Sequence, residues 1–217
     1  MRAYREAEYP EPNRERRMDM DQIIIRKARL EDAKSLLAIY GEYVKHTAIT
    51  FEYDVPQEEE FRARMQRFMQ KYPYLVAQRG EEILGYAYAG SFYGRAAYGW
   101  CAEVTVYLAP EAQGLGLGRR IYAALEDALE KMGVLNLYAC IAVPHGEDDE
   151  YLTGNSMQFH AHMGYTLCGT FSLCGYKFGR WYDMIWMEKL IDEHTATPTP
   201  VMPIEEARIW YETVWQR

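Results

Sequence analysis

Apolar residues recur along the chain at the two spacings that distinguish helices from strands. The clearest helical spacing covers residues 116–132, where apolar side chains return every three or four positions and Gly133 follows as a stop signal. Shorter helices are predicted at residues 30–41, 56–73 and 155–163. The helix at 56–73 has three glutamates in its first turn, where negative charge suits the helix dipole.

Seven runs rich in β-branched and aromatic residues predict strands. They cover residues 23–25, 74–78, 83–91, 100–108, 135–143, 165–174 and 181–190. The second to fourth runs are separated by glycine-containing turns, which predicts an antiparallel meander. The fifth run follows the long helix, and a strand, helix, strand unit closes most readily as a right-handed crossover between parallel strands. This order of elements predicts an α/β sandwich.

The two ends of the chain lack the pattern of the middle. Residues 1–22 are rich in charge, contain Pro10 and Pro12 and show no apolar period, so we expect an extension there. One domain is predicted over residues 23–190. In residues 191–217, a stretch rich in threonine and proline is typical of a linker, and residues 204–215 have the spacing of an amphipathic helix.

The composition fits a packed domain with a small partner. The 217 residues are 49% hydrophobic, which is ample for a core. The net charge of -8 offers no basic surface for nucleic acid or for an anionic membrane, so we expect a small molecule or a second copy of the chain as partner. The chain has neither a leader-like segment nor an apolar run of bilayer length, which predicts a cytoplasmic protein.

The cysteines follow neither the spacing of a zinc ribbon nor that of a redox pair. They are Cys101, Cys140, Cys168 and Cys174. We therefore expect reduced residues in the core.

A glycine-rich segment, Gln113-Gly114-Leu115-Gly116-Leu117-Gly118, lies between a predicted strand and the long helix. The first N–H groups of a helix have no partner within it, and glycine lets an anion approach them closely, so such a turn can bind a pyrophosphate. The acidic residue of a dinucleotide-binding turn and the Gly-Lys-Ser or Gly-Lys-Thr of a P-loop are both missing. A nucleotide-like anion is the favoured ligand, and a glycine turn without a ligand is the alternative.

The order Q-x-x-G-x-G resembles the acetyl-CoA signature of the GNAT superfamily, and other stretches resemble its phosphinothricin and methionine sulfoximine acetyltransferase branch. These stretches are residues 50–52 (TFE), 85–90 (GYAYAG), 95–98 (RAAY), 103–108 (EVTVYL) and 175–183 (GYKFGRWYD). The resemblance implies an α/β GNAT fold, in which a mixed, mostly antiparallel sheet splays at strands 4 and 5 and has helices on both faces. It also implies acetyl-CoA as the acyl donor, with no metal.

The same resemblance places the CoA pyrophosphate on backbone N–H groups of the glycine turn and the pantetheine arm beside strand 4. The residues implied are Val104, Thr105, Val106, Gln113, Gly114, Leu115, Gly116, Leu117, Gly118, Arg119, Asn155 and Ser156. The sequence departs from the family pattern at Thr153, where asparagine is usual, and an acidic insertion at residues 147–150 precedes it.

Two residues are predicted to handle the proton of the amine. Glu103 alternates with Val104 and Val106 along the strand, so it should face the groove that the splayed sheet opens. A carboxylate there can take the proton that an amine must lose before it attacks a thioester, and the alternative is an ordinary exposed glutamate. His160 matches the histidine of the family's S-x-x-x-H stretch and is expected either to assist proton removal or to pack as a structural partner.

The acceptor site is predicted from the stretches that resemble the acceptor side of relatives. Its residues are Phe51, Tyr86, Tyr88, Arg95 and Tyr98. An arginine can clamp a carboxylate with two hydrogen bonds, whereas tyrosines two positions apart on a strand also occur as cross-strand packing. The predicted reaction is direct transfer of acetyl to the primary amine of a small, carboxylate-bearing acceptor, such as an amino acid or the analogues phosphinothricin and methionine sulfoximine.

Other acceptors and another class of function remain as alternatives. Protein N-termini, polyamines and antibiotics are alternative acceptors, and a CoA-binding module without catalysis is the alternative class. The presence of both Glu103 and the complete glycine turn favours the enzyme. A homodimer is predicted from the resemblance and from aromatic side chains that exceed what one small domain hides. They are Trp181, Tyr182, Trp186, Trp210, Tyr211 and Trp215.

Overall fold

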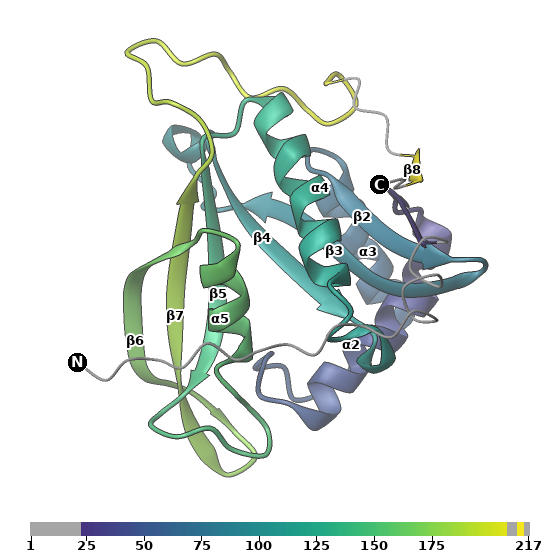
Figure 1. Ribbon diagram of the computed structural model, residues 1–217, viewed down its shortest axis with the longest axis vertical. Coiled ribbons are helices and arrows are strands. Elements are labelled where there is room, and N and C mark those ends of the chain that lie inside the picture. Colours follow the sequence, from purple (N-terminus) through teal and green to yellow (C-terminus); the bar gives the residue numbers. More distant parts are fainter. Residues whose placement is uncertain (1–22, 208–211, 215–217) are drawn as a thin grey trace.

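The computed structural model describes residues 23–207 and 212–214, which form one mixed sheet with helices on both faces (Figure 1). Within these residues the sheet has eight strands in the order β6-β7-β5-β4-β3-β2-β1-β8. The strands are β1 (Ile23–Lys27), β2 (Tyr74–Arg79), β3 (Glu82–Ser91), β4 (Cys101–Leu108), β5 (Asn136–Pro144), β6 (Thr166–Lys177), β7 (Arg180–Leu190) and β8 (Glu212–Val214). The predicted α/β class, the seven strands up to residue 190 and the antiparallel meander of β2, β3 and β4 are confirmed.

The helices divide between the two faces of the sheet. The α-helices in the described residues are α2 (Ala33–His46), α3 (Glu58–Met69), α4 (Leu117–Met132) and α5 (Asn155–His162), with short 3-10 turns η1 (Leu30–Asp32), η2 (Ala96–Tyr98) and η3 (Pro110–Ala112). Figure 1 shows α4 and α5 in front of the sheet and α2 and α3 behind it. The four predicted helices before residue 190 are therefore confirmed, and helices pack on both faces of the sheet.

α4 has the strongest local reason to be a helix. Leu117, Ile121, Leu125 and Leu129 return every four residues, and each is fully buried. The helix stops at Gly133, whose φ of 90° lies in the left-handed region that favours glycine. Burial of this face fixes the first turn of α4, and with it the glycine-rich segment, beside the end of β4.

β4 and β5 run parallel, as the crossover through α4 requires, but they pair for only three residues. The pairs join Cys101 to Asn136, Ala102 to Leu137 and Glu103 to Tyr138. Beyond Glu103, β4 stays paired with β3, and β5 stays paired with β7 along its whole length. The sheet therefore opens into a cleft after Glu103, which confirms the predicted splay.

The prediction of a C-terminal helix at 204–215 is wrong for the residues that the structure describes. Residues 204–207 form a turn, and Glu212–Val214 form β8, antiparallel to β1. Without β8, the outer side of β1 would present unpaired backbone groups, so strand pairing there satisfies groups that a helix would leave open. Residues 208–211 and 215–217, like the predicted extension at 1–22, lie outside the described residues.

The segment predicted as a linker lies against the domain. The Trp100 indole nitrogen donates to the Thr199 carbonyl at 2.7 Å, and the Met202 amide donates to the Met132 carbonyl at 2.9 Å. Ile204 is buried in the main core. These contacts hold residues 199–204 at the C-terminal end of α4.

The prediction that the cysteines lie in the core is also wrong. All four are free, but Cys140, Cys168 and Cys174 are exposed and Cys101 is half-buried. Cys168 and Cys174 lie on the edge strand β6, where most residues are exposed, and Cys140 is the one exposed residue of β5. Within the described residues no group of three or more His, Cys, Asp or Glu is placed to hold a metal ion. No helix in this part of the chain is long and apolar enough to cross a membrane.

Candidate active site

The opening between β4 and β5 forms a narrow cleft of about 60 Å³. Its walls are Val104, Thr105, Val106 and Tyr107 of β4, Ala139, Cys140, Ile141 and Ala142 of β5, Ser156 and His160 of α5, and Ile49. The inner edges of the two strands have no strand partner here, because their pairing ends at Glu103. Backbone N–H and C=O groups on such an edge can bind an extended ligand as another strand would.

The glycine-rich segment lies where the cleft meets the start of α4. Gly114 and Gly116 adopt φ of 71° and 76°, and a Cβ atom at either position would meet nothing within 4 Å. Gly116 is the N-cap of α4, so the first N–H groups of the helix are directed past it. Gly118 is buried, and its missing side chain lets Leu108 and Phe159 pack closely. The segment therefore combines two open glycines, at which an anion can approach the helix N-terminus, with a third glycine that is buried against Leu108 and Phe159.

Two other residues predicted to bind acetyl-CoA differ in how exposed their side chains are. Leu117 is fully buried in the core, so only its backbone can meet a ligand, whereas Arg119 is exposed. The side chain of Gln113 donates to the Tyr43 hydroxyl at 3.1 Å, and that hydroxyl donates to the Leu108 carbonyl at 2.7 Å. Gln113 thus fixes the last residue of β4 through Tyr43.

Ser156 and Asn155 begin α5 beside the cleft. Ser156 lines the cleft, whereas Asn155 is absent from its walls. The Asn155 amide donates to the Thr153 hydroxyl at 3.4 Å. Thr153 therefore acts as a local turn residue at the position where asparagine was expected.

Glu103 is the last residue of β4 that pairs with β5, so it stands at the point where the cleft begins. Its side chain shares a sheet face with Thr105 and Tyr107. The carboxyl is half-buried, and burial raises its pKa above the ordinary value of 4.5. Among residues 23–207 and 212–214, no hydrogen bond or ion pair holds this carboxyl. It is a carboxylate with raised basicity and no protein partner.

His160 is held on both sides of its ring. It is 5% exposed, its Nε2 lies 2.9 Å from the Tyr122 hydroxyl, and its Nδ1 lies 2.7 Å from the Ser156 carbonyl. Burial lowers the pKa of His160, so the ring is neutral at pH 7. In a neutral ring Nδ1 donates to the carbonyl and Nε2 accepts from the tyrosine, so neither nitrogen is left for a substrate.

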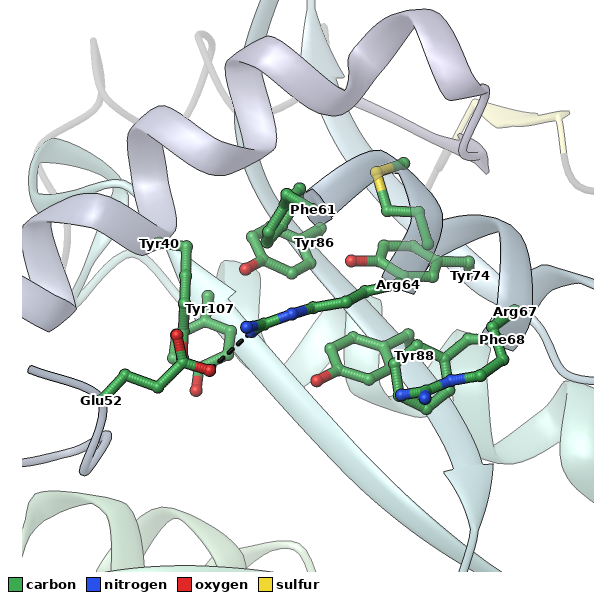
Figure 2. Close-up of a pocket in the computed structure, with 11 residues that line it drawn as sticks. Tyr40, Glu52, Phe61, Arg64, Arg67, Phe68, Tyr74, Tyr86, Tyr88 and Tyr107 are labelled. Atoms are coloured by element: carbon green, nitrogen blue, oxygen red, sulfur yellow. Dashed lines mark hydrogen bonds and ion pairs between the residues drawn. The ribbon is translucent and has the colours of Figure 1, made fainter. Parts of the chain in front are cut away.

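A second, larger cavity of about 220 Å³ lies beneath α2 and α3, on the face of β4 that carries Glu103 and Tyr107 (Figure 2). We call it the tyrosine cavity. It is lined by Tyr40, Glu52, Phe61, Arg64, Met65, Arg67, Phe68, Tyr74, Tyr86, Tyr88 and Tyr107. Tyr86 and Tyr88, which were predicted to contact the acceptor, are both in this lining. They also stack on Tyr74, with ring centroids 5.9 and 4.8 Å away, so packing and cavity lining coincide.

The tyrosine cavity and the cleft adjoin along β4. Tyr107 lines both spaces. The charge of Glu103 raises the pKa of Tyr88, which lines the cavity, and of Cys140, which lines the cleft, although burial is the larger cause for each. Glu103 is therefore electrostatically close to both spaces.

The other predicted acceptor residues lie elsewhere. Phe51 packs against Tyr182 and over Gly175, where a Cβ atom would collide with its ring. Arg95 and Tyr98 are exposed at the turn between β3 and β4 and line neither space. The structure thus brings two of the five predicted residues together in one cavity.

Several lining residues were missed because they come from separate parts of the chain. Arg64 of α3 binds Glu52, twelve residues earlier, at 2.5 Å (Figure 2). Glu52 ends the stretch 50–52, but that stretch contains no sign of a pairing with a residue twelve positions later. Tyr40 and Tyr74 have the spacing of ordinary core residues, and only tertiary packing directs them to one space.

The comparisons with known proteins agree with this geometry. Residues 25–186 match the model of the acetyltransferase (GNAT) domain. The chain is 32% identical to phosphinothricin N-acetyltransferase of Streptomyces viridochromogenes, over 84% of this chain and 94% of that protein. It is 30% identical to L-methionine sulfoximine/L-methionine sulfone acetyltransferase of Salmonella typhimurium, over 79% and 96%. A crystal structure of phosphinothricin acetyltransferase from Sinorhizobium meliloti with acetyl-CoA matches with a TM-score of 0.73 and 33% identity, over 82% and 94%.

Proposed function

The chain belongs to the GNAT family of acetyltransferases, and on that premise we propose how its own residues carry acetyl transfer to a small amine. The reaction moves acetyl from acetyl-CoA to the primary amine of an amino acid or a close analogue. We assign the acyl donor to the cleft between β4 and β5 and the proton transfer to Glu103. The observation that carries the proposal is the position of Glu103, unpaired and half-buried, where the two strands part.

The cleft and the glycine turn suit the two parts of acetyl-CoA. The free edges of β4 and β5 suit the amide-containing pantetheine arm. The open Gly114 and Gly116 at the N-terminus of α4 suit the pyrophosphate, because N–H groups and the helix dipole favour an anion there. Bound acetyl-CoA supplies the acetyl group as a reactive thioester.

Glu103 serves as the general base in this proposal. A protonated amine cannot attack, so a group at the cleft must accept its proton, directly or through one water molecule. The raised pKa of Glu103 makes its carboxylate a better proton acceptor than an exposed glutamate. The two strands hold the reacting groups in order, which contributes to the rate by proximity.

We assign to His160 the role of holding α5 in position beside the cleft. Its two hydrogen bonds connect Tyr122 of α4 with the Ser156 carbonyl of α5. The ring therefore fixes the wall of the cleft that α5 provides. The proposal gives the proton to Glu103, and His160 keeps that wall in place.

The acceptor is a primary amine that also carries a carboxylate. Arg95 remains the proposed partner of that carboxylate, with Phe51 and Tyr98 beside the acceptor. Two of the compared proteins are named for phosphinothricin and for methionine sulfoximine and sulfone, and these amino-acid analogues are the first acceptors to test. Protein N-termini, polyamines and antibiotics are the alternative acceptors.

A panel assay tests this proposal. Purified protein with acetyl-CoA would be given phosphinothricin, methionine sulfone, methionine sulfoximine, common amino acids, a polyamine and a peptide, and release of the CoA thiol would be measured. We expect fast release with the amino-acid analogues. Binding of CoA without thiol release for any amine would favour a CoA-binding module instead.

We further propose that the enzyme is a cytoplasmic homodimer. Large side chains are exposed on the outer strands β6 and β7, namely Leu167, Phe171, Leu173, Tyr176 and Trp181. Such apolar surface is typical of an interface. Tyr182, from the aromatic set predicted to be in excess, is buried and does not contribute, and Trp210, Tyr211 and Trp215 lie outside the described residues. The four free cysteines suit a reducing compartment.

A further inference from the structure

The chain continues past the matched acetyltransferase domain, and this continuation lies against the body of the protein. The domain match ends at residue 186. We call residues 191–207, which follow β7, the C-terminal strap. The strap contains neither helix nor strand, but Ile204 is 5% exposed within the main core, and Val201 and Ala207 pack against that core. Buried side chains of this kind hold a terminal segment in one place.

The strap crosses the root of the splay between β4 and β5. The root consists of the three residue pairs from Cys101 with Asn136 to Glu103 with Tyr138. Among the described residues, these pairs are all the strand pairing that joins the half of the sheet containing β5, β6 and β7 to the half containing β1 to β4. Parallel pairs are also slightly less stable per residue than antiparallel ones. The sheet alone therefore fixes the angle between its two halves only weakly.

On the β5 side, the strap binds at the start of that strand. The Ile191 amide donates to the Leu135 carbonyl at 2.9 Å. The Nε2 atom of His194 lies 2.8 Å from the side-chain oxygen of Asn136. An amide oxygen only accepts hydrogen bonds, so the His194 ring donates through Nε2. The strap is thus attached to β5 at the residue where pairing with β4 begins.

On the β4 side, Trp100 joins the strap to the root. The Trp100 carbonyl accepts hydrogen bonds from the amides of Leu135 and Asn136 at 2.9 and 3.1 Å. The Trp100 indole nitrogen donates to the Thr199 carbonyl of the strap at 2.7 Å. Trp100 therefore binds β5 through its backbone and the strap through its side chain, directly before β4 begins.

Beyond Trp100, the strap passes the C-terminal end of α4 and reaches the other half of the sheet (Figure 1). The Met202 amide donates to the Met132 carbonyl at 2.9 Å, at the end of α4. The Ile204 amide donates to the Lys71 carbonyl at 3.1 Å, in the turn between α3 and β2. The strap therefore links the two halves of the sheet independently of the three strand pairs.

We infer that the strap clamps the root of the splay, and that Trp100 is a positioning residue through which this clamp sets the width of the donor cleft. The effect on acetyl-CoA rests on the proposed function, whereas the clamp itself does not. Trp100 lines neither the cleft nor the tyrosine cavity, so it acts through the strands and not by touching a ligand.

A small rotation at the root becomes a displacement that matters in the cleft. The part of β5 beyond Tyr138 ends at Pro144 and is about 20 Å long at a rise of ~3.3 Å per residue. At that length a rotation of about 3° moves the far end of the strand by about 1 Å. A free protein that samples wider clefts binds its donor more weakly, in proportion to the fraction of molecules that have the fitting width.

The first experiment removes one bond of the clamp. Trp100→Phe keeps an aromatic ring and the backbone but loses the indole N–H that binds Thr199. Acetyl-CoA would be titrated by calorimetry into the wild type, into Trp100→Phe and into the control Ile39→Val. Ile39 is buried in α2 and lines neither space, so its substitution lowers the melting temperature by removing core packing alone.

The two variants should differ in affinity. We expect Trp100→Phe to weaken acetyl-CoA binding by about two- to tenfold, the value of one hydrogen bond that favours the fitting width. Ile39→Val should keep the wild-type affinity. Equal affinities of Trp100→Phe and the wild type would overturn the role of Trp100.

The second experiment cuts the strap in the intact protein. Residues 195–197 are exposed and lie between the two attachment points at His194 and Thr199. A recognition sequence for a specific protease would be inserted after Ala196, so that the same protein is measured before and after cleavage. Hydrogen exchange would be followed at the root, in residues 135–138, with β2 and β3 as the internal reference.

Cleavage should loosen the root and the donor site together. We expect exchange at the root to become about two- to tenfold faster and acetyl-CoA binding to weaken by a similar factor, with unchanged exchange in β2 and β3. Unchanged exchange at the root after complete cleavage would overturn the clamp. Faster exchange with unchanged affinity would overturn its link to the cleft. A wild type that binds no acetyl-CoA would contradict the proposed function, and exchange at the root would still decide on the clamp.

Discussion

Glu103→Gln separates the chemistry of the carboxyl from its place in the strand. The amide has nearly the same shape, and no described hydrogen bond or ion pair holds the Glu103 carboxyl, so the fold and the affinity for CoA should persist. Loss of a general base typically reduces the rate about a hundredfold to ten-thousandfold. At 1.36 kcal/mol per factor of ten, that corresponds to about 3 to 5 kcal/mol of transition-state stabilisation.

The pH dependence follows from the raised pKa of Glu103. Wild-type kcat/KM should fall on the acid side as the carboxylate becomes protonated, with a midpoint above the ordinary value of 4.5. Glu103→Gln should lack this limb, and its deficit should shrink at high pH, where more of the amine arrives already deprotonated. A full pH profile with methionine sulfone measures both effects.

Glu103→Gln should lower the rate but raise the stability of the fold at neutral pH. A carboxyl whose pKa is raised by folding binds its proton more tightly in the folded state, so its ionisation costs stability at pH values above the folded pKa. Glu103→Gln removes this cost and should melt at a higher temperature than the wild type at pH 7. The difference should vanish as the pH falls below the pKa of an unfolded glutamate. Thermal unfolding at several pH values checks the sign.

Glu188→Gln is the matched control. Glu188 lies on β7 opposite Tyr138, which itself lies opposite Glu103, and it lines neither the cleft nor the tyrosine cavity. The same chemical change two strands away should leave the rate unchanged. If Glu103→Gln retained wild-type kcat across neutral pH, the base would have to be another group, and the reasoning from strand parting and burial would be refuted.

Three further predictions concern the donor site, the loop between α2 and α3, and assembly. Gly116→Val should abolish measurable CoA binding by calorimetry in a folded protein, because φ of 76° strains a branched residue and the side chain fills the open approach to α4; unchanged affinity would remove the anion site. Lys177→Met should lower the free energy of unfolding by about 1–3 kcal/mol in denaturant titrations, since the carbonyls of Thr47 and Thr50 lose their donor; equal stability would contradict it. Light scattering should show a dimer that Trp181→Glu dissociates, and a monomeric wild type at micromolar concentration would refute the interface.

The sequence predicted those parts of the fold that depend on local pattern. The apolar period of α4 and the glycines at its two ends mark where the helix begins and ends, so the position of the glycine-rich segment at its N-terminus could be predicted. Glu103 could be predicted because alternation along one strand fixes which side chains face together. The helix predicted at residues 204–215 was wrong although the helical spacing is present in the sequence. Residues 212–214 pair with the edge of β1 instead, and a local pattern cannot reveal such a pairing.

The tyrosine cavity could not be predicted in the same way. Its walls come from α2, α3, the loop between them and three strands. Tyr86 and Tyr88 alternate as packing residues do, and the sequence contains no sign that the hydroxyl of Tyr86 lacks a hydrogen-bond partner among the described residues. The compensation of Arg64 by Glu52 and Glu60 depends on how α3 lies over the sheet. Charge balance at a site is a tertiary property, whereas the composition gives only the net charge of the whole chain.

The loop between α2 and α3 connects the two spaces physically. Ile49 lines the donor cleft, and Glu52, three residues later, lines the tyrosine cavity. The buried Lys177 amino group of β6 donates to two carbonyls of this loop at 2.8 Å each, and the Tyr53 hydroxyl donates to the Tyr176 carbonyl at 2.6 Å. The loop therefore joins the β6 side of the sheet to the α3 side.

The loop between α2 and α3 connects the two halves of the sheet where strand pairing between β4 and β5 has ended. Beyond Glu103, no strand pairing holds β4 to β5, so other contacts must set the distance between the two halves. Phe51 packs over Gly175 of β6, where any side chain would push the loop away, and this contact acts across that gap. A shift of the loop would widen the cleft and move Glu52 away from Arg64 together. The cleft and the tyrosine cavity thus share one segment, which is held in place by contacts with Lys177 and Gly175.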